Sequence, residues 1–227
     1  RYIERMLEVH QCPDEGEAHP APAMEQPSPL FIVGFNSDGG EELAKLLAKH
    51  PKLAWSGNTA ALDAARTSLN GRDLEPLGRL RPKDIQRARE AYFGATAKKV
   101  NQGQRIVDSV PLNILSLPLI HRLFPESGII RMVRHPVETV FQAFRTVHAV
   151  NAVTCHLDSM SRCAQFYLAV NAMGDHYRDT LGIPMSEIAY EEFTLCPQTY
   201  AAAIAESLDL AWQELAGHKP ASPRDHW

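Results

Sequence analysis

Hydrophobic and polar positions along the chain alternate between short apolar runs and longer stretches in which apolar residues recur every three or four positions. The short runs are rich in β-branched and aromatic residues, which predicts strands at 30–33, 52–56, 105–110, 129–133 and 185–190. The longer stretches predict helices at about 41–50, 82–96, 111–123, 136–147, 158–181 and 197–208. Such alternation predicts an α/β fold, in which helices cover both faces of a parallel sheet and ligands bind beyond the carboxyl ends of the strands.

Two of the predicted helices carry apolar stripes that we interpret as core contacts. The stripe of the helix at 111–123 consists of Leu112, Leu115, Leu119, Ile120 and Leu123. The stripe of the helix at 158–181 consists of Met160, Cys163, Tyr167, Val170, Met173 and Tyr177. Aromatic and sulfur-containing residues at this spacing are more typical of packing than of a cofactor site.

Composition divides the chain into four parts. Residues 1–10 resemble the end of an upstream helix, and residues 11–29 combine five prolines with acidic residues, which predicts an extended linker. A domain is expected over 30–216, followed by a tail over 217–227. The chain starts at Arg1 rather than Met, so we expect an upstream fused domain or a partner protein.

Charge and hydrophobicity exclude several classes of function. A net charge of −4 with no long basic run argues against a nucleic-acid partner or an anionic membrane surface. No apolar run reaches the roughly 20 residues of a bilayer span, and no signal peptide is evident, so we expect a cytoplasmic protein. The four cysteines form no CxxC pair and show no metal-type spacing with histidine, which predicts reduced thiols and no metal site.

The most informative stretch begins with the strand predicted at 30–33. It is followed by Gly34, then by Gly39 and Gly40, and then by a helix with leucines at 43, 46 and 47. A strand, a glycine loop and a helix N-terminus in this order aim backbone N–H groups at a phosphate.

Several segments together resemble the PAPS-dependent sulfotransferases, particularly the bacterial type often fused to tetratricopeptide repeats, with the tyrosylprotein sulfotransferases as relatives. Residues 31–51 resemble the motif IVGxPRSGTTLLxxLLxxHP, and residues 119–139 resemble LIHxxFPxAxIIxxxRxPxDT. Shorter similarities lie at 107–113, 189–193 and 208–212. The resemblance implies a P-loop-like three-layer α/β/α fold with a central parallel sheet. It also implies transfer of a sulfuryl group from PAPS to a hydroxyl acceptor.

The resemblance assigns family roles to ten positions. The 5′-phosphate loop corresponds to Gly34, Ser37, Asp38, Gly39, Gly40 and Glu41. The 3′-phosphate site corresponds to Arg134 and Gln142, the family lysine to Ser109, and the family general base to Asn58. Most of these positions depart from the family pattern, because Asn36 to Glu41 replace the family's Pro-Arg-Ser-Gly-Thr-Thr.

The departures reverse the charge of the loop. Two carboxylates about 5 Å from a phosphate charge would repel it by roughly 7 kcal/mol at an effective dielectric near 20. The residues therefore predict weak or absent binding of PAPS or its product PAP, and a non-catalytic structural or interaction module. The alternative is an active sulfotransferase with altered nucleotide contacts.

Some individual residues also have alternative roles that do not involve the nucleotide. The acids Asp38, Glu41 and Glu42 are expected to cap their own helix, with a divalent-cation site as the other possibility. Arg134 could pair with Glu138 one helical turn further on instead of binding an anion.

Overall fold

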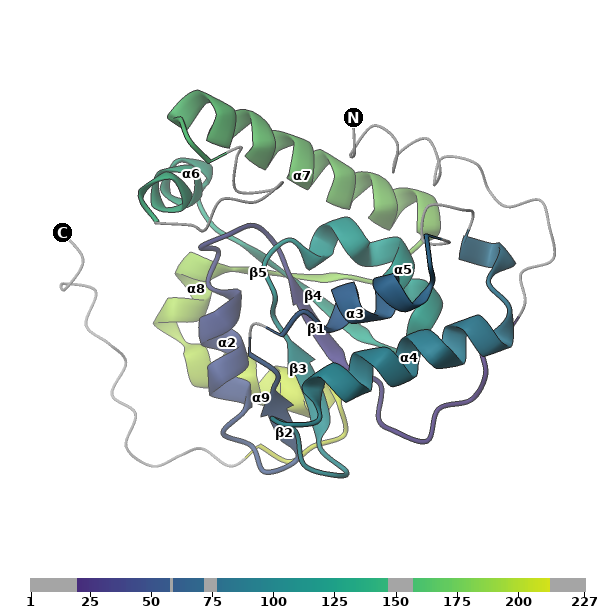
Figure 1. Ribbon diagram of the computed structural model, residues 1–227. Helices are drawn as coiled ribbons and strands as arrows, with labels where there is room; N and C mark the ends of the chain where they lie inside the picture. The colour runs from purple at the N-terminus through teal and green to yellow at the C-terminus, as the bar shows by residue number, and fades with distance from the viewer. Residues whose placement is uncertain (1–19, 58, 72–76, 147–156, 213–227) are drawn as a thin grey trace.

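The structure is a computed structural model that describes residues 20–57, 59–71, 77–146 and 157–212. Its centre is a parallel sheet of five strands in the order β2-β3-β1-β4-β5 (Figure 1). The strands are β1 (Leu30–Val33), β2 (Leu53–Trp55), β3 (Arg105–Asp108), β4 (Gly128–Val133) and β5 (Ser186–Ala189). All five predicted strands are present, with ends shifted by a few residues.

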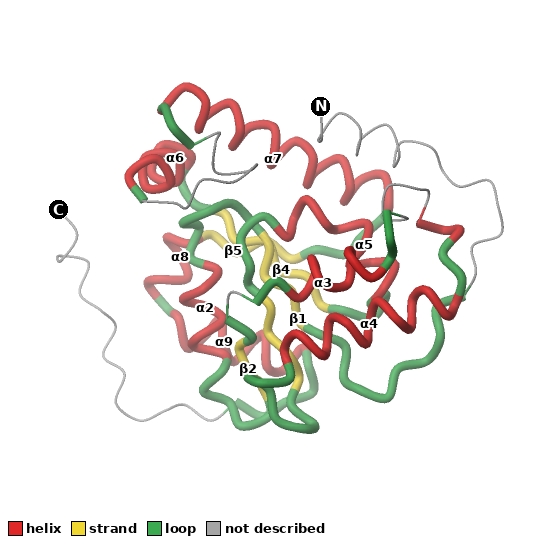
Figure 2. The backbone as a smooth tube through the Cα atoms, in the orientation of Figure 1, coloured by secondary structure: helices red, strands yellow, loops and turns green. Residues whose placement is uncertain are grey.

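Helices cover both faces of the sheet, as Figure 2 shows in outline. The α-helices of the described part are α2 (Gly40–Leu47), α3 (Ala61–Ser68), α4 (Pro82–Thr96), α5 (Leu117–Leu123), α6 (Pro136–Arg145), α7 (Met160–Leu181), α8 (Tyr190–Leu195) and α9 (Pro197–Ser207). Two 3₁₀ turns, η2 (Leu77–Arg79) and η3 (Asn113–Ser116), precede α4 and α5. The predicted three-layer α/β/α architecture with a central parallel sheet is confirmed.

The side chains of β1 explain why the fold has two cores. Successive strand residues point to opposite faces of a sheet. Phe31 and Val33 therefore belong to one buried cluster, with residues of α3, α4, α5, α6 and α7. Leu30 and Ile32 belong to the other, with residues of α2, α8 and α9. Because β1 is buried on both faces, its sequence is a continuous apolar run rather than an alternation of apolar and polar residues.

Local sequence signals explain several helix starts. Proline occupies the first turn of α4, α5, α6 and α9, where its missing N–H would have no helical partner. Helix α4 packs on the core through one face, on which Ile85, Ala88, Tyr92 and Thr96 are all buried. The long helix α7 ends at Gly182, which adopts the left-handed conformation typical of a C-terminal cap.

Three sequence predictions need correction. The helix expected at 111–123 begins only at Leu117, because Leu112 has a φ of 70° and a 3₁₀ turn follows it. Met160 is 40% exposed rather than inward, since it is the first residue of α7 and precedes the first buried turn. Helix α3 was not predicted, because its eight residues carry only a short apolar face.

Part of the predicted linker contacts the domain. Residues 20–29 form no helix or strand, yet Ala21 and Met24 pack against the core, and Arg89 donates a hydrogen bond of 2.6 Å to the carbonyl of Pro22. Residues 1–19 and the predicted tail at 217–227 lie outside the described residues. Among the helices that the structure describes, none has the length and apolar character of a bilayer span.

Candidate functional site

The carboxyl ends of the strands bring most of the predicted site residues to one edge of the sheet. Gly34 follows β1, Ser109 follows β3, and Arg134 follows β4. Tyr190, which sequence reasoning did not assign to the site, follows β5. Parallel strands all end at the same edge, so these residues face the same region.

The loop after β1 leads into the N-terminus of α2, so the predicted order of strand, glycine loop and helix is present. Ser37 and Gly39 adopt left-handed conformations, with φ of 68° and 96°, and turn the chain into α2. The carbonyl of Gly39 accepts the first helical bonds, from the N–H groups of Glu42 and Leu43. Glycine is required at position 39 for a second reason, since an added Cβ would lie 2.2 Å from the ring of Tyr190.

Asp38 occupies the interior of this loop. Its Oδ1 accepts a hydrogen bond of 2.8 Å from the N–H of Gly40, and the residue is 9% exposed. Gly34 makes room for the carboxyl group, because a Cβ at that position would lie 1.8 Å from Oδ2. The first amide of α2 is therefore satisfied by a carboxylate of the same loop.

Burial dominates the chemistry of this carboxyl group. Desolvation raises the pKa of Asp38 from 3.8 to about 7, although hydrogen bonds from backbone N–H groups and the charge of Arg134 oppose the rise. Near neutral pH the group is therefore present in both protonated and ionised forms.

The other two acids of the loop point elsewhere. Glu41 pairs with Lys45 one turn along α2 at 2.5 Å, and both side chains are about half exposed. Glu42 lies beside Tyr190, where burial, followed by the charge and hydrogen bonding of Glu42, raises the pKa of the phenol. The alternative of a divalent-cation site gains no support, because in the described ranges no three His, Cys, Asp or Glu side chains converge to hold a metal ion.

Arg134 lies against the loop. Its Nη1 donates a hydrogen bond of 3.2 Å to the carbonyl of Ser37, and its guanidinium stacks 4.6 Å from the ring centroid of Tyr190. The predicted pair with Glu138 also forms, at a longer 3.9 Å. Gln142, the other residue matched to the 3′-phosphate site, lies two turns along α6 and is half buried.

The end of β3 carries a buried polar network. Asp108 is fully buried and accepts hydrogen bonds from the Tyr92 hydroxyl and the Asn113 amide, both at 2.9 Å. Burial raises the pKa of Asp108 to about 6, against these hydrogen bonds. Ser109 is also buried, and its Oγ accepts a bond of 2.9 Å from the indole of Trp55. The hydroxyl at the position matched to the family's lysine is thus engaged in a hydrogen bond with a neighbouring side chain.

A cation that sequence reasoning missed reaches the end of β2. Asn58, which matches the family's general base, lies outside the described residues. Its neighbour Gly57 has a φ of 65°, and a Cβ there would lie 2.4 Å from Nζ of Lys99. Lys99 comes from the turn after α4, more than 40 positions away in the sequence, so no local motif could have indicated this contact.

Comparison with known proteins identifies the family. A model of the sulfotransferase family matches residues 29–214, which is most of the chain. The chain belongs to the sulfotransferase family. Sulfotransferases generally use PAPS as the sulfuryl donor.

Solved structures of sulfotransferases are similar to this chain over most of its length. A sulfotransferase from Alicyclobacillus acidocaldarius matches with a TM-score of 0.54 and 17% identity, over 82% of this chain and 82% of that chain. A sulfotransferase from Mycobacterium avium matches with a TM-score of 0.55 and 12% identity, over 94% and 68%. The sulfotransferase domain of the Synechococcus PCC 7002 olefin synthase matches with a TM-score of 0.53 and 17% identity, over 86% and 78%. At these identities the likeness shows the shared fold.

One curated relative is much longer than this chain. An uncharacterized protein of Aquifex aeolicus is 21% identical over 233 residues. The match covers 93% of this chain and 29% of that protein. The chain thus spans less than a third of the curated relative that it matches.

Proposed function

We propose that this chain is a sulfotransferase-family domain that no longer carries out PAPS chemistry and acts as a structural or interaction module. One observation carries the proposal. The carboxylate of Asp38 accepts the N–H of Gly40 inside the loop that would otherwise hold the 5′-phosphate. The residues of this loop therefore do not fit PAPS, since a buried acid takes the place of a family hydroxyl.

Adding a phosphate to this loop carries an electrostatic cost. A phosphate dianion about 5 Å from ionised Asp38 is repelled by roughly 7 kcal/mol at an effective dielectric near 20. Because the pKa of Asp38 is about 7, uptake of a proton relieves this repulsion at a cost of about 1.4 kcal/mol at pH 8. The loss of the family's loop arginine, lysine and second hydroxyl removes the groups that would offset the repulsion.

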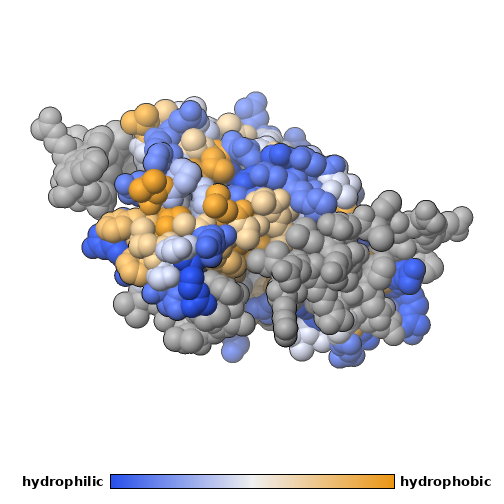
Figure 3. Space-filling view, turned by 90° about the horizontal axis from the view of Figure 1, so that it is seen from above, coloured by the Kyte–Doolittle hydropathy of each residue, from blue (hydrophilic) through white to orange (hydrophobic). Residues whose placement is uncertain are grey.

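An exposed apolar face supports a role in interactions. Val137, Phe141 and Phe144 recur at helical spacing on α6 and are 64%, 41% and 40% exposed. Figure 3 shows apolar side chains gathered on the side of the molecule where α6 lies. Exposed apolar faces of this kind mark contact sites for other proteins. The partner would be a fused domain or a separate protein.

A second candidate is an active sulfotransferase with altered nucleotide contacts, which moves a sulfuryl group from PAPS to a hydroxyl acceptor. The position of Arg134 beside the loop favours it, and so does the amine of Lys99 beside Gly57. These cations would supply part of the positive charge that the loop itself lacks.

Titration of the protein with PAP by calorimetry separates the two functions. The measurement is best made at pH 8, where Asp38 is mostly ionised. We expect no binding at millimolar PAP. Micromolar binding would overturn the non-catalytic proposal and would favour the active enzyme.

A further inference from the structure

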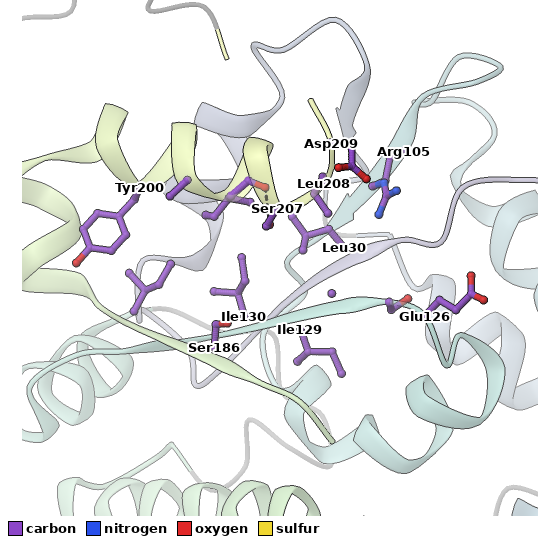
Figure 4. Close-up of a pocket in the computed structure, with 15 residues that line it drawn as sticks. Leu30, Arg105, Glu126, Ile129, Ile130, Ser186, Tyr200, Ser207, Leu208 and Asp209 are labelled. Atoms are coloured by element: carbon purple, nitrogen blue, oxygen red, sulfur yellow. Dashed lines mark hydrogen bonds between the residues drawn. The ribbon is translucent and has the colours of Figure 1, made fainter. Parts of the chain in front are cut away.

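A cavity of about 470 Å³ lies at the edge of the sheet opposite to the loop after β1 (Figure 4). It is lined by the first residues of four strands, Leu30, Arg105, Gly128 and Ser186. The C-terminal half of α9 closes it from the other side. Its volume falls in the range of about 300–1,000 Å³ that is typical of small-molecule sites.

Local structure explains why the space is open. Gly128 has no side chain, and a Cβ there would lie 3.0 Å from Cδ1 of Leu30. Helix α9 ends at Ser207, and Asp209 with its φ of 58° turns the chain across the end of the cavity. The N–H of Leu210 then donates back to the carbonyl of Ala205 at 2.9 Å, which fixes this turn.

The two ends of the cavity differ in chemistry. In Figure 4, Arg105, Asp209 and Glu126 lie at one end and Tyr200 lies at the other. The wall between them is apolar and is formed by Leu30, Ile130, Ile188, Ile204 and Leu208. A ligand that fills the cavity therefore needs an apolar body and one charged or polar end.

Two hydrogen-bond donors at the charged end are unused. The Oγ of Ser127 is buried and has no hydrogen-bond partner in the described part of the chain. The guanidinium of Arg105 makes no hydrogen bond or ion pair with any described residue, and burial lowers its pKa while the charge of Asp209 raises it. The hydroxyls of Ser207 and Tyr200 are already used, since they donate to Ile204 and Glu192.

The charged side chains at this end of the cavity restrict the class of ligand that can bind. A simple anion would bind Arg105 but would also meet Glu126 and Asp209, which together outweigh one cation. A simple cation would compete with Arg105 for Asp209, whose charge already acts on the half-buried guanidinium. A head group that carries both charges satisfies all three side chains.

We propose that this cavity binds a small zwitterion with an apolar side chain, of the class of aliphatic and aromatic amino acids. Its carboxylate pairs with Arg105 and accepts from Ser127. Its ammonium pairs with Asp209 and Glu126, and its side chain lies along the apolar wall toward Tyr200. This site is separate from the loop after β1, so it does not depend on the function proposed for that loop.

Three matched probes test the charge requirement. We would titrate the protein with L-phenylalanine, with 3-phenylpropionate, which lacks the amine, and with 2-phenylethylamine, which lacks the carboxylate. Methyl NMR signals of Ile130, Ile188 and Ile204 report binding at the wall. We expect L-phenylalanine to shift these signals and to bind at least tenfold more tightly than either analogue. Equal binding of the three probes, or no shift with L-phenylalanine, would overturn the proposal.

Two variants test the location. Arg105→Gln removes the guanidinium, and Ala203→Trp on α9 places a large side chain at the cavity. Each should weaken L-phenylalanine binding at least tenfold, whereas the exposed control Lys98→Gln should leave it unchanged. Thermal unfolding checks that each variant is folded. Unchanged affinity in a folded Ala203→Trp variant would contradict this location.

Discussion

Replacing Asp38 by Asn tests whether the loop holds a buried carboxyl group with a raised pKa. Asn keeps the size of the side chain, and its amide oxygen still accepts from the N–H of Gly40, but the ionisable group is gone. In the folded protein the pKa of Asp38 is about 7, against an ordinary value of 3.8. Between these two values the folded state holds a proton that the unfolded state has released, so the wild type loses stability as pH rises.

The size of the effect follows from the two pKa values. A difference of about three pH units corresponds to about 4 kcal/mol, of which about 3 kcal/mol falls between pH 5 and pH 8. The free energy of unfolding of Asp38→Asn relative to wild type should therefore increase by about 3 kcal/mol over this interval. Asp108, whose pKa is also raised, contributes a fall in stability with pH that is common to both proteins.

Urea unfolding at pH 5 and at pH 8 provides the measurement. Glu41→Gln is the matched control, because Glu41 lies three residues further on, in the first turn of α2, but is half exposed and paired with Lys45. The control should follow the wild-type pH dependence to within about 0.5 kcal/mol. If Asp38→Asn and wild type show the same dependence, the pKa of the Asp38 carboxyl group is not raised by burial as described above.

Two further substitutions test contacts around the site by their effect on the free energy of unfolding. Gly39→Ala should destabilise the fold by more than the 1–2 kcal/mol expected from its left-handed backbone alone, because its methyl group would meet the ring of Tyr190. Gly103→Ala, at a φ of 84° with open space around it, measures the backbone cost by itself, and equal losses in the two variants would contradict the steric argument. Tyr92→Phe removes a hydrogen bond to buried Asp108 and should cost about 1.5–3 kcal/mol, with a larger loss at pH 8 than at pH 5; a loss that does not depend on pH would contradict this role.

The sequence predicts the sheet well because β1 and β4 are short apolar runs bounded by turn residues. It predicts the ends of helices less well where the backbone leaves the regular pattern, as at Leu112, whose positive φ delays α5 until Leu117. A positive φ at a leucine carries no sequence signal, since leucine rarely adopts it.

The candidate site, too, can be predicted only in part from the sequence. The acidic character of the loop is evident from the sequence, but the different surroundings of Asp38 and Glu41 are not. Asp38 is buried because Gly34 leaves room for its carboxyl group, and Glu41 is exposed because it lies on the outer face of α2. Lys99 and Tyr190 reach the site through tertiary contacts, so only the folded structure places them there.

A paired PAP titration tests the central claim most directly, namely that the loop's own carboxylate and missing cation abolish nucleotide binding. The wild type is compared at pH 8 with the triple variant Ser37→Arg, Asp38→Ser and Glu41→Thr. Gly40 is left unchanged, because a Cβ there would lie 3.1 Å from Cγ2 of Ile32. We predict no binding by the wild type at millimolar PAP and measurable binding by the variant. Micromolar binding by the wild type, or a folded variant that still binds no PAP, would contradict the account.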